Sequence, residues 1–355
     1  MKIYIETYGC AANQSDSDTM KSLLSEKHEF VDSVKKAELI ILNSCGVKGS
    51  TQNKIMARLE KFKDKKVLVA GCLTKIATKL LQEKFPEYSL IGPDQITDIV
   101  EIISKIENKK RVIELKTKSY KLPLLKEPKK VQPITICKGC LGNCAYCATK
   151  LAKGKLQSFP ISCVKKMVEN AVSKGTEKIL LTAQDTGAYG LDIETSLPEL
   201  LREILSIEGN FKIRIGMMNP NYALEYANEL VKIFQNQKMI KFLHIPVQSG
   251  SNKVLKDMHR KYSVEDFKKV VDVFRKKIPD IKIGTDIICG LPNETKEDLK
   301  KTLELVKQTK PDMLNISKFY PRPGTEAKKM KLLPTETVKQ RSRKLSNLFK
   351  ELRKA

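Results

Sequence analysis

The sequence lacks any long apolar run. No apolar stretch approaches the roughly 18 residues that a transmembrane helix needs, and the longest, such as residues 67–73, suit buried strands. The N-terminus also lacks the apolar core of a signal peptide, because Glu6 places a charge where that core would lie. No internal repeat in residue identity is present. We therefore expect a cytoplasmic protein with no membrane-embedded part.

Acidic residues are scarce relative to basic ones. The chain has 66 Lys and Arg against 41 Asp and Glu, which gives a formal net charge of +25. A field of this sign favours polyanions, of which nucleic acid is the commonest in the cytosol, although a general preference for lysine would produce the same balance. With 355 residues, 41% apolar and 30% charged, the composition is that of a globular protein of about two domains and excludes a disordered or collagen-like chain.

The chain divides into four predicted segments. Residues 1–115 alternate short strands, predicted at 2–8, 38–43, 66–70 and 111–114, with helical patterns, which predicts an N-terminal open, parallel α/β sheet. Residues 116–133 form a Lys/Pro-rich linker that includes Lys121. Residues 134–334 repeat the alternation, with strands predicted at 134–136, 178–183, 211–217, 242–247, 281–288 and 313–319. Six such units predict a partial (β/α)6 TIM-like barrel. Residues 335–355 predict a basic amphipathic helix.

Three cysteines follow the first strand of the second series, in Cys140-Leu-Gly-Asn-Cys144-Ala-Tyr-Cys147. Three thiolates on one short loop can bind three irons of a cubane cluster and leave the fourth iron open. Cys137 could add a fourth thiolate and close such a cluster, or make a structural zinc site. Zinc ribbons space their cysteine pairs more widely, and we expect Cys137 not to be a ligand.

Three further cysteines share a position just past a predicted strand. Cys10, Cys45 and Cys72 follow the strands at 2–8, 38–43 and 66–70. In a parallel sheet the carboxyl ends of strands meet at one edge, so these cysteines are predicted to converge and hold a second cluster. Cys163 and Cys289 have no such partners and are interpreted as structural.

Motifs along nearly the whole chain resemble those of radical S-adenosylmethionine methylthiotransferases. Besides the triplet, they are Tyr8-Gly-Cys-Ala-Ala-Asn-Gln-Ser15, Asn43-Ser-Cys-Gly-Val47, Gly71-Cys-Leu73, Gln184-Asp-Thr-Gly-Ala-Tyr-Gly190, His244-Ile-Pro-Val-Gln-Ser-Gly-Ser251, Thr285-Asp-Ile-Ile-Cys-Gly-Leu-Pro292 and Tyr320-Pro-Arg-Pro-Gly-Thr325. Two more, Arg214-Ile-Gly-Met-Met-Asn-Pro220 and Ala148-Thr-Lys-Leu-Ala-Lys-Gly154, are similar to the archaeal and eukaryotic branch that acts on threonylcarbamoyladenosine in tRNA.

The resemblance implies two [4Fe-4S] clusters, S-adenosylmethionine and an external electron donor. The cluster on Cys140, Cys144 and Cys147 would reduce S-adenosylmethionine, and the resulting radical would take hydrogen from C2 of the modified adenosine beside the anticodon, at position 37. The cluster on Cys10, Cys45 and Cys72 would present sulfur to that carbon, methylated by a second S-adenosylmethionine. The modified base must leave its stack to reach such a site, as bases in RNA loops can.

The resemblance also implies further site residues. Tyr146, Gln184, Asp185, Gln248 and Ser249 would contact S-adenosylmethionine, although the last four could also be plain strand-end caps. His244 lies on an apolar strand and is interpreted as a core histidine. Candidates for RNA contact are the polar or basic side chains Arg214, Asn219, Arg322, Lys339 and Arg343.

One departure from the family is expected. The chain ends about where a C-terminal TRAM-type β-barrel would begin, so a separate RNA-binding protein could supply that module, or the basic tail could compensate. Alternative functions remain open: a methylthiotransferase for isopentenyladenosine or a ribosomal protein residue, or an iron-sulfur electron-transfer or RNA-binding protein without radical turnover.

Overall fold

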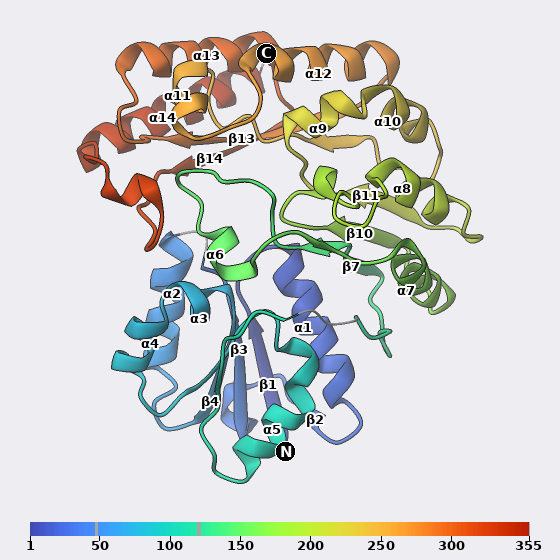
Figure 1. The fold of residues 1–355 in the computed structure, drawn as a ribbon, viewed down its shortest axis with the longest axis vertical. Helices are drawn as coiled ribbons and strands as arrows, with labels where there is room; N and C mark the ends of the chain where they lie inside the picture. The colour runs from blue at the N-terminus through green and yellow to red at the C-terminus, as the bar shows by residue number, and fades with distance from the viewer. Residues whose placement is uncertain (47–48, 119–121, 355) are drawn as a thin grey trace. The chain divides into compact units, whose positions relative to one another are not determined.

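The computed structural model describes residues 1–46, 49–118 and 122–354, and it divides into two compact units (Figure 1). Unit 1 comprises Met1–Cys140 and Ala148–Gln184, and unit 2 comprises Leu141–Cys147 and Asp185–Ala355. Val47, at the end of one motif, and Lys121, in the expected linker, lie outside the described residues. No helix in the described part of the chain is long and apolar enough to cross a membrane.

Unit 1 contains a six-stranded parallel sheet in the order β2-β1-β3-β4-β5-β6 (Figure 1). Its strands are β1 (Lys2–Thr7), β2 (Glu29–Phe30), β3 (Leu39–Ser44), β4 (Lys66–Gly71), β5 (Ser89–Ile91) and β6 (Ile113–Glu114). Strand β3 is buried at every position, as expected for a central strand covered on both faces.

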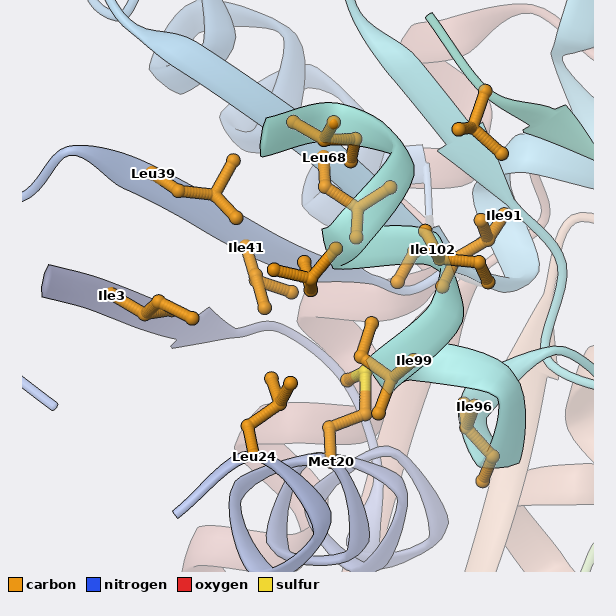
Figure 2. Close-up of a cluster of buried hydrophobic side chains, with 14 residues drawn as sticks. Ile3, Met20, Leu24, Leu39, Ile41, Leu68, Ile91, Ile96, Ile99 and Ile102 are labelled. Atoms are coloured by element: carbon orange, nitrogen blue, oxygen red, sulfur yellow. The ribbon is translucent and has the colours of Figure 1, made fainter. Parts of the chain in front are cut away.

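Alternate residues of these strands belong to two hydrophobic layers, one on each face of the sheet. Leu39 and Ile41 of β3 pack with α1 and α5 on one face, as Figure 2 shows, whereas Ile40 and Leu42 pack with α2 and α4 on the other. The elements that cover the sheet are α1 (Ala11–Leu24), η1 (Val34–Lys36), α2 (Gly49–Glu60), α3 (Cys72–Ile76), α4 (Thr78–Lys84), η2 (Ile96–Asp98) and α5 (Ile99–Glu107).

The rest of unit 1 begins the second β/α series. Strands β7 (Val131–Thr135) and β10 (Lys178–Thr182) pair in parallel, and β8 (Cys137–Lys138) pairs antiparallel with β9 (Gln157–Ser158). Helices α6 (Thr149–Lys153) and α7 (Ile161–Ser173) lie between β8 and β10 in the chain.

Unit 2 continues the series. Strands β12 (Phe242–His244), β13 (Lys282–Cys289) and β14 (Met313–Lys318) form a parallel sheet, and β11 (Lys212–Ile215) precedes them. The helices are η3 (Thr186–Ala188), α8 (Leu197–Leu205), α9 (Pro220–Glu225), α10 (Ala227–Phe234), α11 (Asn252–Asp257), α12 (Val264–Lys277), α13 (Lys296–Thr309), η4 (Glu326–Lys329) and α14 (Thr335–Leu352). Capping boxes at Ser196, Ser263 and Thr295 open α8, α12 and α13.

The predicted fold class is confirmed: a parallel α/β sheet is followed by a second β/α series. The predicted strands are present, with several ends as predicted and the others shifted by up to three residues. The sequence pattern missed β2, β5, β8 and β9, because strands of two and three residues are too short to show periodicity.

Candidate active site

The three long-range cysteines lie where three neighbouring strands of unit 1 end. Cys10 is the N-cap of α1 after β1, Cys45 directly follows β3, and Cys72 directly follows β4 and opens α3. Strands β1, β3 and β4 are adjacent and parallel. A Cβ built on Gly9 would lie 2.9 Å from the Cβ of Cys45, which shows how closely the first two loops approach. The sheet topology therefore brings these three thiols to one edge.

Two buried asparagines fix these loops. Asn43 Nδ2 donates to the carbonyl of Asn13 at 2.8 Å and to Ser17 Oγ at 2.9 Å, and Asn13 Nδ2 donates to Asn43 Oδ1 and to the Ser44 carbonyl, both at 3.2 Å. Asn13 also accepts from Cys10 Sγ at 3.4 Å. The network binds the start of α1 to the end of β3, so Cys10 and Cys45 are held by the same side chains.

A buried cation lies near these thiols. Lys153 Nζ is 3.3 Å from Asp16 Oδ2, and both side chains are buried. Burial raises the pKa of the Cys72 thiol to about 12; the charge of Lys153 lowers it, and those of Cys10 and Cys45 raise it further. Buried Lys153 is therefore placed to offset negative charge when these cysteines are thiolates.

The triplet loop starts from a constrained turn in unit 1. Gly139 has φ +71, and a Cβ there would lie 1.8 Å from the Lys155 carbonyl oxygen, so only glycine fits. Cys140 N donates to the Gly154 carbonyl oxygen at 3.3 Å. Cys137 is fully buried, and its backbone pairs with Ser158 in the β8–β9 ladder. That Cys137 is not a cluster ligand stays a prediction.

The other two cysteines of the triplet are held within unit 2. Cys147 N donates to the Cys144 carbonyl at 3.0 Å, and Ala145 N donates to the Met258 carbonyl at 3.2 Å. Tyr146 packs against the cluster of Val254, Met258 and Leu291, and burial raises its pKa well above the ordinary value. The tyrosine before the last cysteine therefore anchors the loop in the core of unit 2.

Arg260 connects Cys144 to two strand-end residues. Its Nη1 donates to Cys144 Sγ at 3.1 Å, its Nε donates to the Tyr262 hydroxyl at 2.8 Å, and its Nη2 donates to Asn219 Oδ1. Asn219 in turn donates from Nδ2 to Asp185 Oδ2 at 2.6 Å and from its backbone N to Oδ1 at 3.1 Å. A pocket beside this network is lined by Cys144, Asp185, Asn219 and Arg260 among others.

Asp185 is the buried acid of this network. Burial raises its pKa to about 6, and the hydrogen bonds from Asn219 and from Gly187 N, together with the charge of Arg260, lower it again. Its carboxylate accepts three hydrogen bonds within unit 2, so it orders the network as well as facing the pocket.

Two of the predicted cofactor residues carry buried acceptors that are not used. The amide oxygens of Gln184 and Gln248 accept no hydrogen bond from any residue in the described ranges. Gln248 also adopts φ +70, a left-handed conformation that a glutamine holds only at a cost. Because a buried acceptor without a donor is costly, both amides are suited to accept from a bound molecule. Ser249, by contrast, contacts Thr302 Oγ1 at 3.4 Å and accepts from Ser251 N at 3.2 Å, as a structural cap would.

The predicted RNA contacts fall into three environments. Asn219 belongs to the Arg260 network. Arg322 is only 2% exposed, with its guanidinium over the Tyr320 ring, whereas Arg214 on β11 is half-buried. Lys339 and Arg343 are exposed on α14. His244, which was interpreted as a core histidine, is half-buried, and its Nε2 lies 2.9 Å from the carboxylate oxygen Oδ1 of Asp286.

Arg260 and Lys153 were not predicted from the sequence as site residues. Arg260 meets Cys144 across 116 positions of sequence, and Lys153 meets Asp16 across 137. Lys153 lies in the motif at residues 148–154, but no spacing within that motif indicates its partner, and Arg260 lies in none of the motifs, so only the folded chain reveals these contacts.

The donor set fits iron-sulfur chemistry. Within the described ranges, no three His, Cys, Asp or Glu side chains lie close enough together to hold a metal ion. We therefore infer the ligand sets from the positions of the cysteines at the strand ends and from the donor type. Thiolates are the ligands that iron-sulfur clusters require. Within unit 2, the unused amide oxygen of Gln248 and the pocket at Cys144 are each suited to contact a polar molecule.

Comparisons with known proteins agree with this chemistry. Residues 134–306 match a family model described as the radical SAM superfamily, and residues 2–92 match one described as Uncharacterized protein family UPF0004. A probable threonylcarbamoyladenosine tRNA methylthiotransferase of Archaeoglobus fulgidus is 43% identical over 361 residues, covering 99% of this chain and 84% of the relative. The Xenopus laevis threonylcarbamoyladenosine tRNA methylthiotransferase is 40% identical, covering 98% of this chain and 65% of that protein.

Solved structures share the fold. The radical S-adenosylmethionine methyltransferase TsrM from Kitasatospora setae, with tryptophan and a SAM analogue bound, superimposes with a TM-score of 0.66 at 14% identity. The match covers 92% of this chain and 74% of that one. At this identity the likeness concerns the fold alone. The relatives, the two matched domains and the shared fold confirm the resemblance seen in the motifs, and the chain belongs to the radical S-adenosylmethionine methylthiotransferases, in the threonylcarbamoyladenosine tRNA branch.

Proposed function

We propose that this protein adds a methylthio group to C2 of N6-threonylcarbamoyladenosine at position 37 of tRNA. Relatives with this name are 37–43% identical over nearly the whole chain and come from archaea and eukaryotes. The observation that carries the proposal is the placement of Cys10, Cys45 and Cys72 at three neighbouring strand ends, in a chain that also has the Cys140 triplet. An enzyme that only cleaved S-adenosylmethionine would need the triplet alone.

The cofactors are S-adenosylmethionine and two [4Fe-4S] clusters. We assign one cluster to Cys140, Cys144 and Cys147 and the other to Cys10, Cys45 and Cys72. When bound, the clusters supply the electron that cleaves S-adenosylmethionine and the sulfur that is inserted. An external electron donor must deliver that electron.

The chain's own residues have supporting roles in this proposal. Tyr146 anchors the triplet loop, and Arg260 holds Cys144 through a charged hydrogen bond. Asp185 and Asn219 order Arg260, and the buried amide oxygens of Gln184 and Gln248 would each be available to accept a hydrogen bond from S-adenosylmethionine. Lys153 offsets negative charge at the strand-end cysteines.

We further propose that tRNA contacts include Lys339 and Arg343 on α14, because both are exposed and basic. The net charge of +25 favours a polyanionic partner. We also propose a cytoplasmic location, which a tRNA substrate supports.

The test is anaerobic reconstitution with iron and sulfide, followed by incubation with dithionite, S-adenosylmethionine and tRNA. We expect 5′-deoxyadenosine and a methylthiolated nucleoside from the unaltered protein. Cys140→Ala should abolish both products, whereas Cys10→Ala should keep 5′-deoxyadenosine but abolish the modified nucleoside. Cys163→Ala, a cysteine outside both sets, should change neither.

Other outcomes would point to the alternatives. Iron binding without any 5′-deoxyadenosine would indicate an electron-transfer or RNA-binding protein. 5′-Deoxyadenosine without a modified nucleoside would indicate another substrate, such as isopentenyladenosine or a ribosomal protein residue, or the need for a separate RNA-binding protein.

A further inference from the structure

One face of the strands of unit 2 carries a row of polar and aromatic side chains. We call Arg214 of β11, Phe242 and His244 of β12, Asp286 of β13 and Asn315 of β14 the polar row. All five are partly or fully exposed, whereas their strand neighbours Ile213, Ile215, Leu243, Thr285 and Ile287 are buried. The inward face of a fully packed barrel is filled by bulky aliphatic residues. The polar row instead leaves polar and charged groups accessible on these strands.

Contacts connect the row from end to end. The Arg214 guanidinium lies 4.3 Å from the Phe242 ring centroid, and the Phe242 and His244 rings meet edge to face at 6.2 Å. His244 Nε2 is 2.9 Å from Asp286 Oδ1, and Asn315 Nδ2 donates to the same oxygen at 2.7 Å. Asp286 is therefore engaged by a histidine and an amide.

Arg214 is the member of the row whose charge is not balanced. Among the described residues no carboxylate lies within ion-pair distance of its guanidinium, and its contact is with the face of Phe242. Burial lowers its pKa, which means that its charged form has lost water without gaining an anion. A half-buried guanidinium in this state favours binding of an anion that enters beside the ring.

The substrate of the proposed function carries such an anion. The N6 substituent of threonylcarbamoyladenosine ends in a threonine carboxylate, beside a hydroxyl and a urea group. The isopentenyl substituent of the alternative substrate is a plain hydrocarbon. We propose that Arg214 binds the carboxylate of the N6 substituent, on the Phe242 ring, and so selects threonylcarbamoyladenosine; this inference rests on the proposed function.

The geometry favours a carboxylate of the base over an RNA phosphate. Phosphates lie on the outside of the RNA and are met by exposed side chains such as Lys339 and Arg343. Arg214 is instead half-buried and lies against an aromatic ring, so an anion that inserts beside the ring meets it with less competition from water. A base turned out of the anticodon loop brings its N6 substituent into a protein in this way.

The experiment measures binding of full-length protein to three anticodon stem-loops by fluorescence anisotropy. They carry threonylcarbamoyladenosine, its carboxyl methyl ester, or unmodified adenosine at position 37. Each is titrated against unaltered protein, Arg214→Gln, Arg214→Lys and Lys241→Gln. Lys241 is the matched control, because it is an exposed cation that directly precedes Phe242.

We expect unaltered protein to prefer the acid over its ester by about 10- to 100-fold, the range of a charge-assisted hydrogen bond. Arg214→Gln should lose this preference while binding the ester and unmodified stem-loops as before. Arg214→Lys should restore part of it, since it keeps the charge but not the two-pronged geometry. Lys241→Gln should retain the full preference. A merely structural role for Arg214 would not respond to esterification of the ligand.

Two results would overturn the inference: an Arg214→Gln protein that still prefers the acid, or one that loses affinity equally for all three stem-loops, as at a general backbone contact. Failure of the proposed function is seen separately. It would appear as absence of methylthiolated product from unaltered protein, whatever the acid-to-ester ratio.

Discussion

Gly71 shows how one residue shapes the strand end that precedes Cys72. It adopts φ +93, and a Cβ there would lie 2.5 Å from Asn43 Oδ1 and 2.6 Å from the Ser44 carbonyl oxygen. We predict that Gly71→Ala lowers the free energy of unfolding of unit 1 by about 3 kcal/mol, from backbone strain and the clash together. Thermal unfolding measures the loss.

Gly175 is the matched control for this substitution. It has a similar φ of +87, but nothing lies within 4 Å of a Cβ built there. Gly175→Ala should therefore cost only the backbone strain, about 1 kcal/mol. Equal losses at the two positions would mean that the close approach of Gly71 to the asparagine network has no energetic weight.

At the same scale, Asp185 predicts a pH dependence. Burial raises its pKa to about 6 from an ordinary value of 3.8. Between these values the native protein binds more protons at Asp185 than the unfolded chain does, so its contribution to stability falls as pH rises, by up to about 3 kcal/mol. The Tm of Asp185→Asn minus that of unaltered protein should therefore increase from pH 4 to pH 6.5 and then level off.

Asp298 provides the comparison. Burial raises its pKa, but hydrogen bonds from Ser251 and Thr295 outweigh this effect and hold the pKa at about 2. Its stabilising contribution is nearly complete by pH 5, so the Tm difference for Asp298→Asn should fall only slightly between pH 4 and pH 5 and then stay constant to pH 6.5. A flat difference for Asp185→Asn as well would show that this carboxyl is not perturbed.

At the scale of elements, a buried ion pair joins α14 to the loop after β13. Arg341 Nη1 bonds to the Glu294 carboxylate and to its carbonyl oxygen, and both side chains are less than 10% exposed. Burial raises the pKa of Glu294, so its charge depends on Arg341. We predict that Arg341→Met destabilises unit 2 by about 3 kcal/mol, because it leaves a buried carboxylate unpaired.

The double variant Arg341→Met with Glu294→Gln should recover part of this loss, since no charge is then buried. Arg353→Met is the control. Arg353 caps the C-terminal end of α14, its side chain is 57% exposed, and its Nη1 lies 3.7 Å from Asp312 Oδ1. It should cost less than about 1 kcal/mol in thermal unfolding. If Arg341→Met lowered the stability no more than Arg353→Met does, the ion pair of Arg341 with Glu294 would not stabilise the packing of α14.

Elements also show which features a sequence can predict. The cysteine positions could be predicted because Cys10, Cys45 and Cys72 each follow a strand that contains a run of apolar residues, and parallel strands end at one edge. The capping boxes at Ser196, Ser263 and Thr295 could be predicted because they are local. The contact of Arg260 with Cys144 could not, because it depends on how two distant loops pack.

At the scale of the whole molecule, the excess positive charge predicts salt-dependent tRNA binding. Neutralising Lys339 and Arg343 to Gln should weaken binding and reduce the slope of log affinity against log salt by about 1 to 2, as expected for the loss of two phosphate contacts. Neutralising Lys300 and Lys307, which are exposed on α13, provides a control of equal charge. A control pair that weakened binding as much would mean that α14 has no special part in the contact.

The central claim is tested most directly by the choice of substrate. Reconstituted protein is incubated with S-adenosylmethionine, dithionite and each of two tRNAs, one carrying threonylcarbamoyladenosine at position 37 and the other isopentenyladenosine. Their nucleosides are then analysed by mass spectrometry. We predict a methylthio derivative of threonylcarbamoyladenosine and none of isopentenyladenosine. Methylthiolation of isopentenyladenosine alone, or of neither nucleoside while 5′-deoxyadenosine is formed, would contradict the claim.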